Sequence, residues 1–222
     1  MKMKWTLLII GIIVIIVIGN FVYQSLTKKE EIISPKIEIT MPEKALENKK
    51  IAMIVAFKDF RDEEYFVPKE ILENAGAEIK TASNKMGRAI GADGGDVEID
   101  LLVENLNPAE FDAIVFTGGP GCLENLDNEN SYRVVRETVS QNKVLASICI
   151  SPTILAKAGI LEGKKATVWS SPMDREPVRI LKENGAIYQD KPVVVDGKII
   201  TGNGPGAARE FGETIVEVLT GK

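Results

Sequence analysis

The chain contains no histidine and only two cysteines among its 222 residues. Without histidine, no Ser-His-Asp or Cys-His catalysis can operate within this chain. Cys122 and Cys149 are too few for a disulfide framework, and without histidine they are also too few for a structural zinc site. We therefore expect no metal and no cofactor. The formal net charge of −5 gives no support to nucleic-acid binding, so we expect no nucleic-acid partner.

Charged residues are absent from one long stretch, Trp5 to Tyr23, which is almost wholly apolar. As a helix it would reach about 28 Å, close to the thickness of the hydrocarbon core of a bilayer. A cleaved signal peptide is the competing interpretation, but no small-residue cleavage site follows the run. We expect residues 1–25 to anchor the protein in the cell membrane as a single pass, with residues 5–23 in the lipid bilayer. The lysines on the two sides nearly balance, so the side that carries the soluble domain stays open.

Residues 26–49 are charged, contain prolines and lack strong periodicity, which predicts a tether.

The soluble domain is then residues 50–222. Glycine-rich residues 84–96 predict a loop within it. Strands and helices alternate along the domain, which predicts an α/β fold with a mostly parallel sheet covered on both faces. The expected strands are 50–57, 77–82, 113–116, 144–149 and a hairpin turned at Asp196-Gly197, and the expected helices are 62–74, 130–142, 151–158, 176–184 and 205–219.

Ligands bind beyond the carboxyl ends of the strands in such sheets. That rule gathers residues 58–64, the "TGGPG" loop and the hinge at Cys149 at one edge. This hinge is the junction between the expected strand 144–149 and the expected helix 151–158. Small residues, Ser147 and Ser151, stand two before and two after Cys149, which is the spacing of a nucleophile elbow. The N-terminus of the following helix favours a thiolate there, although a buried and inert cysteine is the alternative.

The "TGGPG" loop offers backbone donors beside that sulfur. The N–H groups of Gly118, Gly119 and Ile150 are candidate donors to an oxyanion. Taken alone, two glycines after a strand more often form only a tight turn.

Four motifs, in order, resemble the ThiJ/DJ-1/PfpI family, which has the class I glutamine amidotransferase-like fold. They are "FRDEEYFVP", "DAIVFTGGPG", "ASICISPTILAKAGIL" and "DGKIITGNGPGAAREFGETIVEVLTGK". The resemblance implies a flavodoxin-like three-layer sandwich and a homodimer. It also implies that Cys149 is the nucleophile and that Glu64, four residues before Pro68, is its carboxylate partner.

The chain departs from the family pattern where the family carries histidine. PfpI-type members have histidine directly after the cysteine, where this chain has Ile150. DJ-1-type members take a histidine from a later strand end, and the corresponding residue here is Trp169. A thiol, a carboxylate and backbone donors remain, so proteolysis is not expected.

Three functions fit these residues. The first is a redox-responsive or protective protein in which Cys149 is oxidised, because that chemistry needs no histidine. The second is a cysteine-dependent hydrolase or a glyoxalase- or deglycase-like enzyme, and the third is an inactive binding module. The small-molecule substrate or oxidant stays open in each case.

Two further expectations concern protons and thiols. Glu64 and Cys149 should share one proton, with the charge on sulfur, because two neighbouring negative charges are costly. Cys122 could act as a resolving thiol for an oxidised Cys149. The alternative is that Cys122 is a surface-loop cysteine without a role.

Overall fold

The computed structural model describes residues 44–221 of the chain. The anchor expected over residues 1–25 and most of the expected tether lie outside the described residues. Among the helices of residues 44–221, none is both long and apolar enough to cross a membrane.

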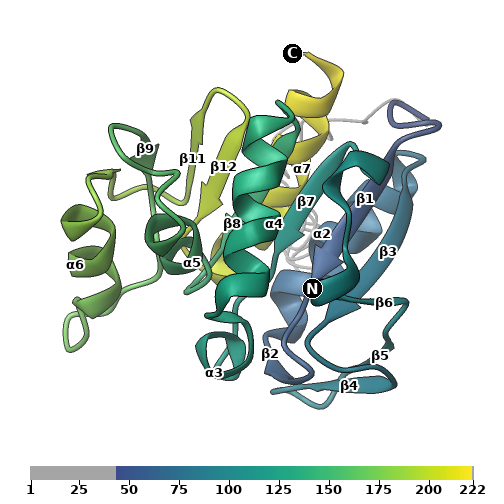
Figure 1. The fold of residues 1–222 in the computed structure, drawn as a ribbon, viewed down its shortest axis with the longest axis horizontal. Coiled ribbons are helices and arrows are strands. Elements are labelled where there is room, and N and C mark those ends of the chain that lie inside the picture. Colours follow the sequence, from purple (N-terminus) through teal and green to yellow (C-terminus); the bar gives the residue numbers. More distant parts are fainter. Residues whose placement is uncertain (1–43, 222) are drawn as a thin grey trace, which may run out of the picture. The chain divides into compact units, whose positions relative to one another are not determined.

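A seven-stranded sheet forms the middle of the domain (Figure 1). Its strand order is β11-β12-β8-β7-β1-β3-β6, and every neighbouring pair is parallel except β11 with β12. The expected α/β fold with a mostly parallel sheet is therefore confirmed. The strands are β1 (Lys50–Ile54), β3 (Glu78–Ser83), β6 (Leu101–Leu102), β7 (Ala113–Phe116), β8 (Val144–Ile148), β11 (Val193–Asp196) and β12 (Ile199–Gly202).

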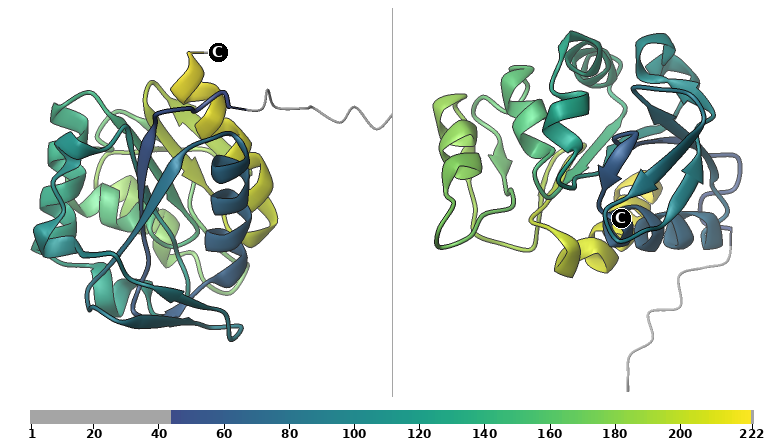
Figure 2. Two further views of the ribbon diagram at one scale, coloured as in Figure 1. Left: turned by 90° about the vertical axis from the view of Figure 1, so that its right-hand side faces the viewer. Right: turned by 90° about the horizontal axis from the view of Figure 1, so that it is seen from below.

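Helices cover both faces of this sheet, which gives the domain three layers. α2 (Asp62–Asn74) and α7 (Ala208–Thr220) pack side by side on one face, and α4 (Glu129–Ser140) lies on the other (Figure 2). α5 (Pro152–Lys157) packs against α4 and α6 (Glu176–Glu183), and α3 (Cys122–Leu126) is a short helix after β7. Because both faces are covered, every residue of β7 and β8 is buried, as their apolar sequences predict.

A second, three-stranded sheet lies at one end of the domain, with the order β2-β4-β5 (Figure 1). It consists of β2 (Lys58–Phe60), β4 (Arg88–Gly91) and β5 (Asp96–Glu98). The prediction of a loop over residues 84–96 is therefore wrong at β4. This strand is too short to give a hydrophobic pattern, and it forms by pairing with β2 and β5. The small sheet holds the chain that leads into α2.

The remaining elements are short. β9 (Lys165–Ala166) and β10 (Ile187–Tyr188) pair with each other. Within residues 44–221, 3₁₀ turns occur at η1 (Val103–Asn105), η2 (Pro108–Glu110) and η3 (Pro205–Ala207).

The described domain includes a turn that precedes β1. Leu46 in this turn is fully buried, and its N–H donates to the carbonyl oxygen of Ala75 at 2.7 Å. The sequence-based boundary at residue 50 therefore leaves out a core side chain.

Candidate active site

Cys149 lies on a sharp turn between β8 and α5. Its φ of 67° is in the left-handed region, which is rare for a residue other than glycine and is typical of strained functional turns. The Cys149 N–H donates to the carbonyl oxygen of Gly202 at 2.9 Å, which ties the turn to β12. The Ser151 hydroxyl lies 2.7 Å from the carbonyl oxygen of Ile148 and 2.8 Å from the Ser147 hydroxyl. The small flanking residues thus brace a nucleophile elbow.

Glu64 comes to this turn from the first turn of α2 and is fully buried. Its Oε2 accepts a hydrogen bond from the Gly118 N–H at 3.1 Å. Its Oε1 is buried and has no nitrogen or oxygen donor among the described residues. A Cβ on Gly118 would lie 2.5 Å from Cys149 Cβ and 2.7 Å from Glu64 Oε2. Only glycine therefore fits between the carboxyl group and the cysteine.

This geometry changes the role expected for Gly118. The sequence suggests its N–H as an oxyanion donor, but in the structure that N–H is bonded to Glu64. The remaining donors at the sulfur are the N–H groups of Gly119 and Ile150. Gly119 has a φ of 116°, and a Cβ there would lie 2.3 Å from the backbone nitrogen of Arg61. Close packing against the start of α2 therefore holds this donor in place.

Burial dominates the electrostatics of the pair. Burial raises the pKa of Glu64 from 4.5 to about 7, against hydrogen bonds from Cys149 and Gly118 that lower it. Burial also raises the pKa of the Cys149 thiol, and the negative charge of Glu64 raises it further, while the N–H groups of Gly119 and Ile150 lower it. Near neutral pH the pair therefore retains at least one proton. The expected thiolate stays a prediction, and burial opposes it.

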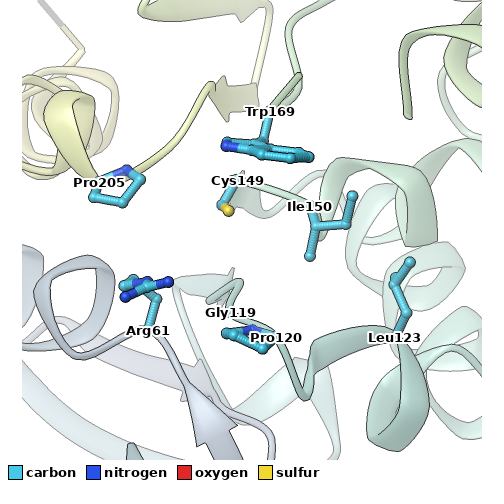
Figure 3. Close-up of a pocket in the computed structure, with 8 residues that line it drawn as sticks. All are labelled: Arg61, Gly119, Pro120, Leu123, Cys149, Ile150, Trp169 and Pro205. Carbon is cyan, nitrogen blue, oxygen red and sulfur yellow. The ribbon is translucent and has the colours of Figure 1, made fainter. Parts of the chain in front are cut away.

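A pocket of about 290 Å³ opens beside the sulfur (Figure 3). The Trp169 side chain forms one wall, and the Trp169 backbone N–H donates to the carbonyl oxygen of Cys149 at 2.8 Å. An indole therefore stands beside the nucleophile, at the residue that the family resemblance aligns with histidine. The lining residues are Arg61, Gly119, Pro120, Leu123, Cys149, Ile150, Trp169 and Pro205.

Arg61 is a site residue that the sequence interpretation missed. It precedes α2 and lies three residues before Glu64, within the segment "FRDEEYFVP". Its backbone N–H donates to the carbonyl oxygen of Gly118 at 3.1 Å, which joins the start of α2 to the glycine loop. The one signal in the sequence was its place in the predicted loop of residues 58–64 at the ligand-binding edge.

Cys122 does not lie on the surface, so the alternative of a surface-loop cysteine is wrong. It is the first residue of α3 and is fully buried. Both cysteines are free thiols, and burial raises the pKa of Cys122 well above its ordinary value. A buried thiol with a raised pKa is a slow nucleophile. Its role as a resolving thiol stays a prediction.

Comparison with known proteins identifies the family of this domain. Residues 49–218 match the profile of the DJ-1/PfpI family. The chain belongs to the DJ-1/PfpI family. A protein of Methanocaldococcus jannaschii described as uncharacterized is 41% identical over 175 residues, covering 78% of this chain and 84% of that protein. Deglycase PfpI of Pyrococcus furiosus is 31% identical over 167 residues, covering 75% of this chain and 98% of the deglycase.

A solved structure agrees with this assignment. The ThiJ/PfpI domain protein from Brachyspira murdochii has a TM-score of 0.74 and 33% sequence identity to this chain. The alignment covers 79% of this chain and 99% of that structure. The elbow of this DJ-1/PfpI domain thus occurs within a fold that is shared with nearly the whole of that structure.

Proposed function

We propose that this chain is a deglycase- or glyoxalase-like enzyme in which Cys149 attacks a small carbonyl compound. The observation that carries the proposal is a cysteine on a strained elbow, next to a buried carboxyl group and two backbone donors, in the lining of a pocket. The deglycase of Pyrococcus furiosus among the relatives supports the same class of chemistry.

The first step uses Glu64 in place of histidine. The ionised carboxylate takes the proton of the Cys149 thiol while the sulfur attacks the carbonyl carbon. The carbonyl oxygen becomes an anion, which the N–H groups of Gly119 and Ile150 stabilise. Glu64 then returns the proton to that oxygen, and a thiohemiacetal results without net proton change. A base with a pKa near the working pH suits this transfer, and the Glu64 pKa of about 7 meets that condition.

Turnover of a 2-oxoaldehyde continues from this adduct. The hydrogen on the thiohemiacetal carbon moves as a proton to the adjacent carbon, the hydroxyl proton moves to the oxygen of the adjacent carbonyl, and the sulfur is left in a thioester. Water then cleaves the thioester and restores the thiol. For methylglyoxal the sum is addition of one water to give lactate and a proton, with no external oxidant or reductant.

A redox-responsive role is the second candidate, since it needs no general base. Oxidation by peroxide proceeds through the thiolate, and the raised pKa of Cys149 keeps that species scarce at neutral pH. Addition to a carbonyl with proton transfer to Glu64 does not require a standing thiolate. The protonation balance therefore favours the enzyme over the redox protein.

Methylglyoxal turnover by the purified protein tests the proposal. We expect lactate formation that is lost in Cys149→Ala and retained in Cys122→Ala. The rate should rise with pH through about 7 as Glu64 ionises, and Glu64→Gln should remove that rise. Mass spectrometry of Cys149 after mild peroxide treatment is run in parallel. Oxidation without turnover would select the redox role. The absence of both oxidation and turnover would select the inactive binding module.

We also propose that residues 5–23 anchor the enzyme in the cell membrane. Their uncharged apolar run supports this placement. The full chain should stay in the membrane fraction after a carbonate wash, and a chain that begins at residue 44 should not. Release of the full chain by carbonate would contradict the anchor.

A further inference from the structure

Arg61 places a positive charge in a pocket whose walls are otherwise mostly apolar. Among the eight lining residues, all within the described part of the chain, Arg61 alone carries a cationic side chain. Figure 3 shows its guanidinium and the sulfur of Cys149 on the walls of the same cavity, with Pro120 and Leu123 along the floor. A ligand that reaches the sulfur therefore meets this cation.

The guanidinium is only partly used by its neighbours. Its Nη1 donates to both carboxylate oxygens of Asp93, at 3.0 and 3.2 Å. Nη2 and Nε have no hydrogen-bond partner among the described residues. The edge formed by these two nitrogens matches the two oxygens of a carboxylate. The Arg61 side chain is 32% exposed and lines the pocket, so a ligand in the pocket can reach the guanidinium.

Neighbouring segments hold Arg61 in this position. The Asp62 carboxylate accepts hydrogen bonds from the N–H groups of Asp93 and Gly95, at 2.8 and 2.5 Å. The loop that supplies Asp93 is therefore attached to the start of α2. Together with the bond from the Arg61 N–H to Gly118, these contacts fix both ends of the arginine. A preorganised cation loses less conformational entropy when it binds an anion.

We propose that Arg61 determines specificity by binding a carboxylate on the substrate, so that the preferred substrates are small carbonyl compounds that carry a carboxylate. The inference rests on the proposed function, because it names the substrate class of the same site. The apolar walls then hold the carbon skeleton, Arg61 binds the carboxylate, and the carbonyl carbon lies at the sulfur. Asp93 limits the attraction by neutralising part of the charge.

Alkylation of Cys149 tests this assignment without relying on turnover. Iodoacetate and iodoacetamide are nearly the same size and differ in charge, and with each the sulfur bonds to the CH₂ carbon as iodide leaves. The ratio of their rates, measured at Cys149 by peptide mass spectrometry, cancels any change in the thiol pKa. We expect Arg61→Met to lower the iodoacetate to iodoacetamide ratio about tenfold, as for loss of a hydrogen bond to a charged group.

Two further variants give the test its controls. Arg88→Met removes the same charge from β4, where Arg88 pairs with Asp96 and Glu98 away from the pocket, and should leave the ratio unchanged. Asp93→Asn frees Arg61 of its counter-charge and should raise the ratio above that of the wild type.

The outcomes separate this inference from the proposed function. Equal ratios in wild type, Arg61→Met and Asp93→Asn would overturn the role of Arg61, even if methylglyoxal is turned over. An equal loss of ratio in Arg88→Met would also overturn it, since the effect would then be one of net charge. A ratio that depends on Arg61 in a protein without turnover would support the anion site and count against the enzyme.

Discussion

The close contact of Gly118, Glu64 and Cys149 is the residue-scale feature on which the site depends. The absent side chain of Gly118 lets a carboxyl group lie next to a thiol, away from water. Desolvation then keeps at least one proton on the Glu64–Cys149 pair near neutral pH. The site thus contains a carboxyl group whose pKa, about 7, is raised into the range of an imidazole.

The buried Glu64 should make stability depend on pH. Its pKa is about 7 in the folded protein and about 4.5 when solvated, so the folded state binds the proton more tightly. This contribution is fully present below pH 4.5 and is lost as the pH rises through 7, on the order of 3 kcal/mol in all. Urea denaturation at pH 5 and pH 8 should show this loss in the wild type and much less of it in Glu64→Gln.

The exposed neighbour Glu63 gives the matched control for this prediction. Glu63→Gln makes the same chemical change one residue earlier on α2 and should keep most of the pH dependence of the wild type, because the Glu63 charge is the smallest of the causes that shift the pKa of Glu64. A Glu64→Gln variant with the same slope as the wild type would show that Glu64 titrates normally.

Gly118→Ala should disrupt the site by steric overlap. The added methyl group would lie within 3.0 Å of Cys149 Cβ, Glu64 Oε2 and the Ile148 carbonyl oxygen. We expect a loss of about 1–3 kcal/mol in the free energy of unfolding, the usual cost of overpacking. Gly206→Ala is the control, because a Cβ there meets no atom within 4 Å. Equal thermal unfolding midpoints for the two variants would contradict the contact.

At the scale of elements, the strand–turn–helix unit of β8, Cys149 and α5 determines where the nucleophile lies. The apolar β8 is held within the sheet, and proline at the first position of α5 favours the start of that helix. Residues 149–151 join the two elements, and the first of them, Cys149, adopts a φ of 67°. The strain falls on Cys149, where it directs the sulfur toward the pocket.

This strain should reverse the usual effect of glycine on stability. At most positions an Ala→Gly change is destabilising because glycine has more freedom in the unfolded chain. At residue 149 the left-handed φ costs a non-glycine residue about 1–2 kcal/mol. Cys149→Gly should therefore be more stable than Cys149→Ala by about 1 kcal/mol in urea denaturation. The opposite order would mean that the turn is unstrained.

At the scale of the whole molecule, the domain begins before its first strand. Leu46 fills the core under the loop after α2, and Lys44 Cα lies 3.1 Å from the position of a Cβ on Gly76. A chain of residues 44–222 should be more stable to urea than one of residues 50–222, by about 2 kcal/mol for the buried leucine. Leu46→Ala in the longer chain should reproduce most of the difference. Equal stabilities would place the boundary at residue 50.

The homodimer implied by the family resemblance stays a prediction for this chain. Light scattering on residues 44–222 should give twice the monomer mass at micromolar concentration. A monomer mass across that range would remove the prediction.

The sequence by itself determined the fold class of this protein and the place of Cys149 on a strand-to-helix turn. Apolar runs of strand length alternate with amphipathic helices along the chain. The apolar faces of both must be buried against each other, and a parallel sheet covered by helices is one of the few arrangements that achieve this. The small residues around Cys149 specify the elbow, because local sterics decide that turn. The motif order then identified the DJ-1/PfpI family and the partner Glu64.

Only the tertiary structure decided what the site can do. Burial raises the pKa of both Glu64 and Cys149, and burial is a property of all the layers around them, which no local pattern encodes. The Gly118 N–H binds Glu64 instead of an oxyanion because α2 approaches the glycine loop across the sheet edge. Arg61 entered the site for the same reason: the short strands β2 and β4, formed by long-range pairing, set the position from which its side chain reaches the pocket.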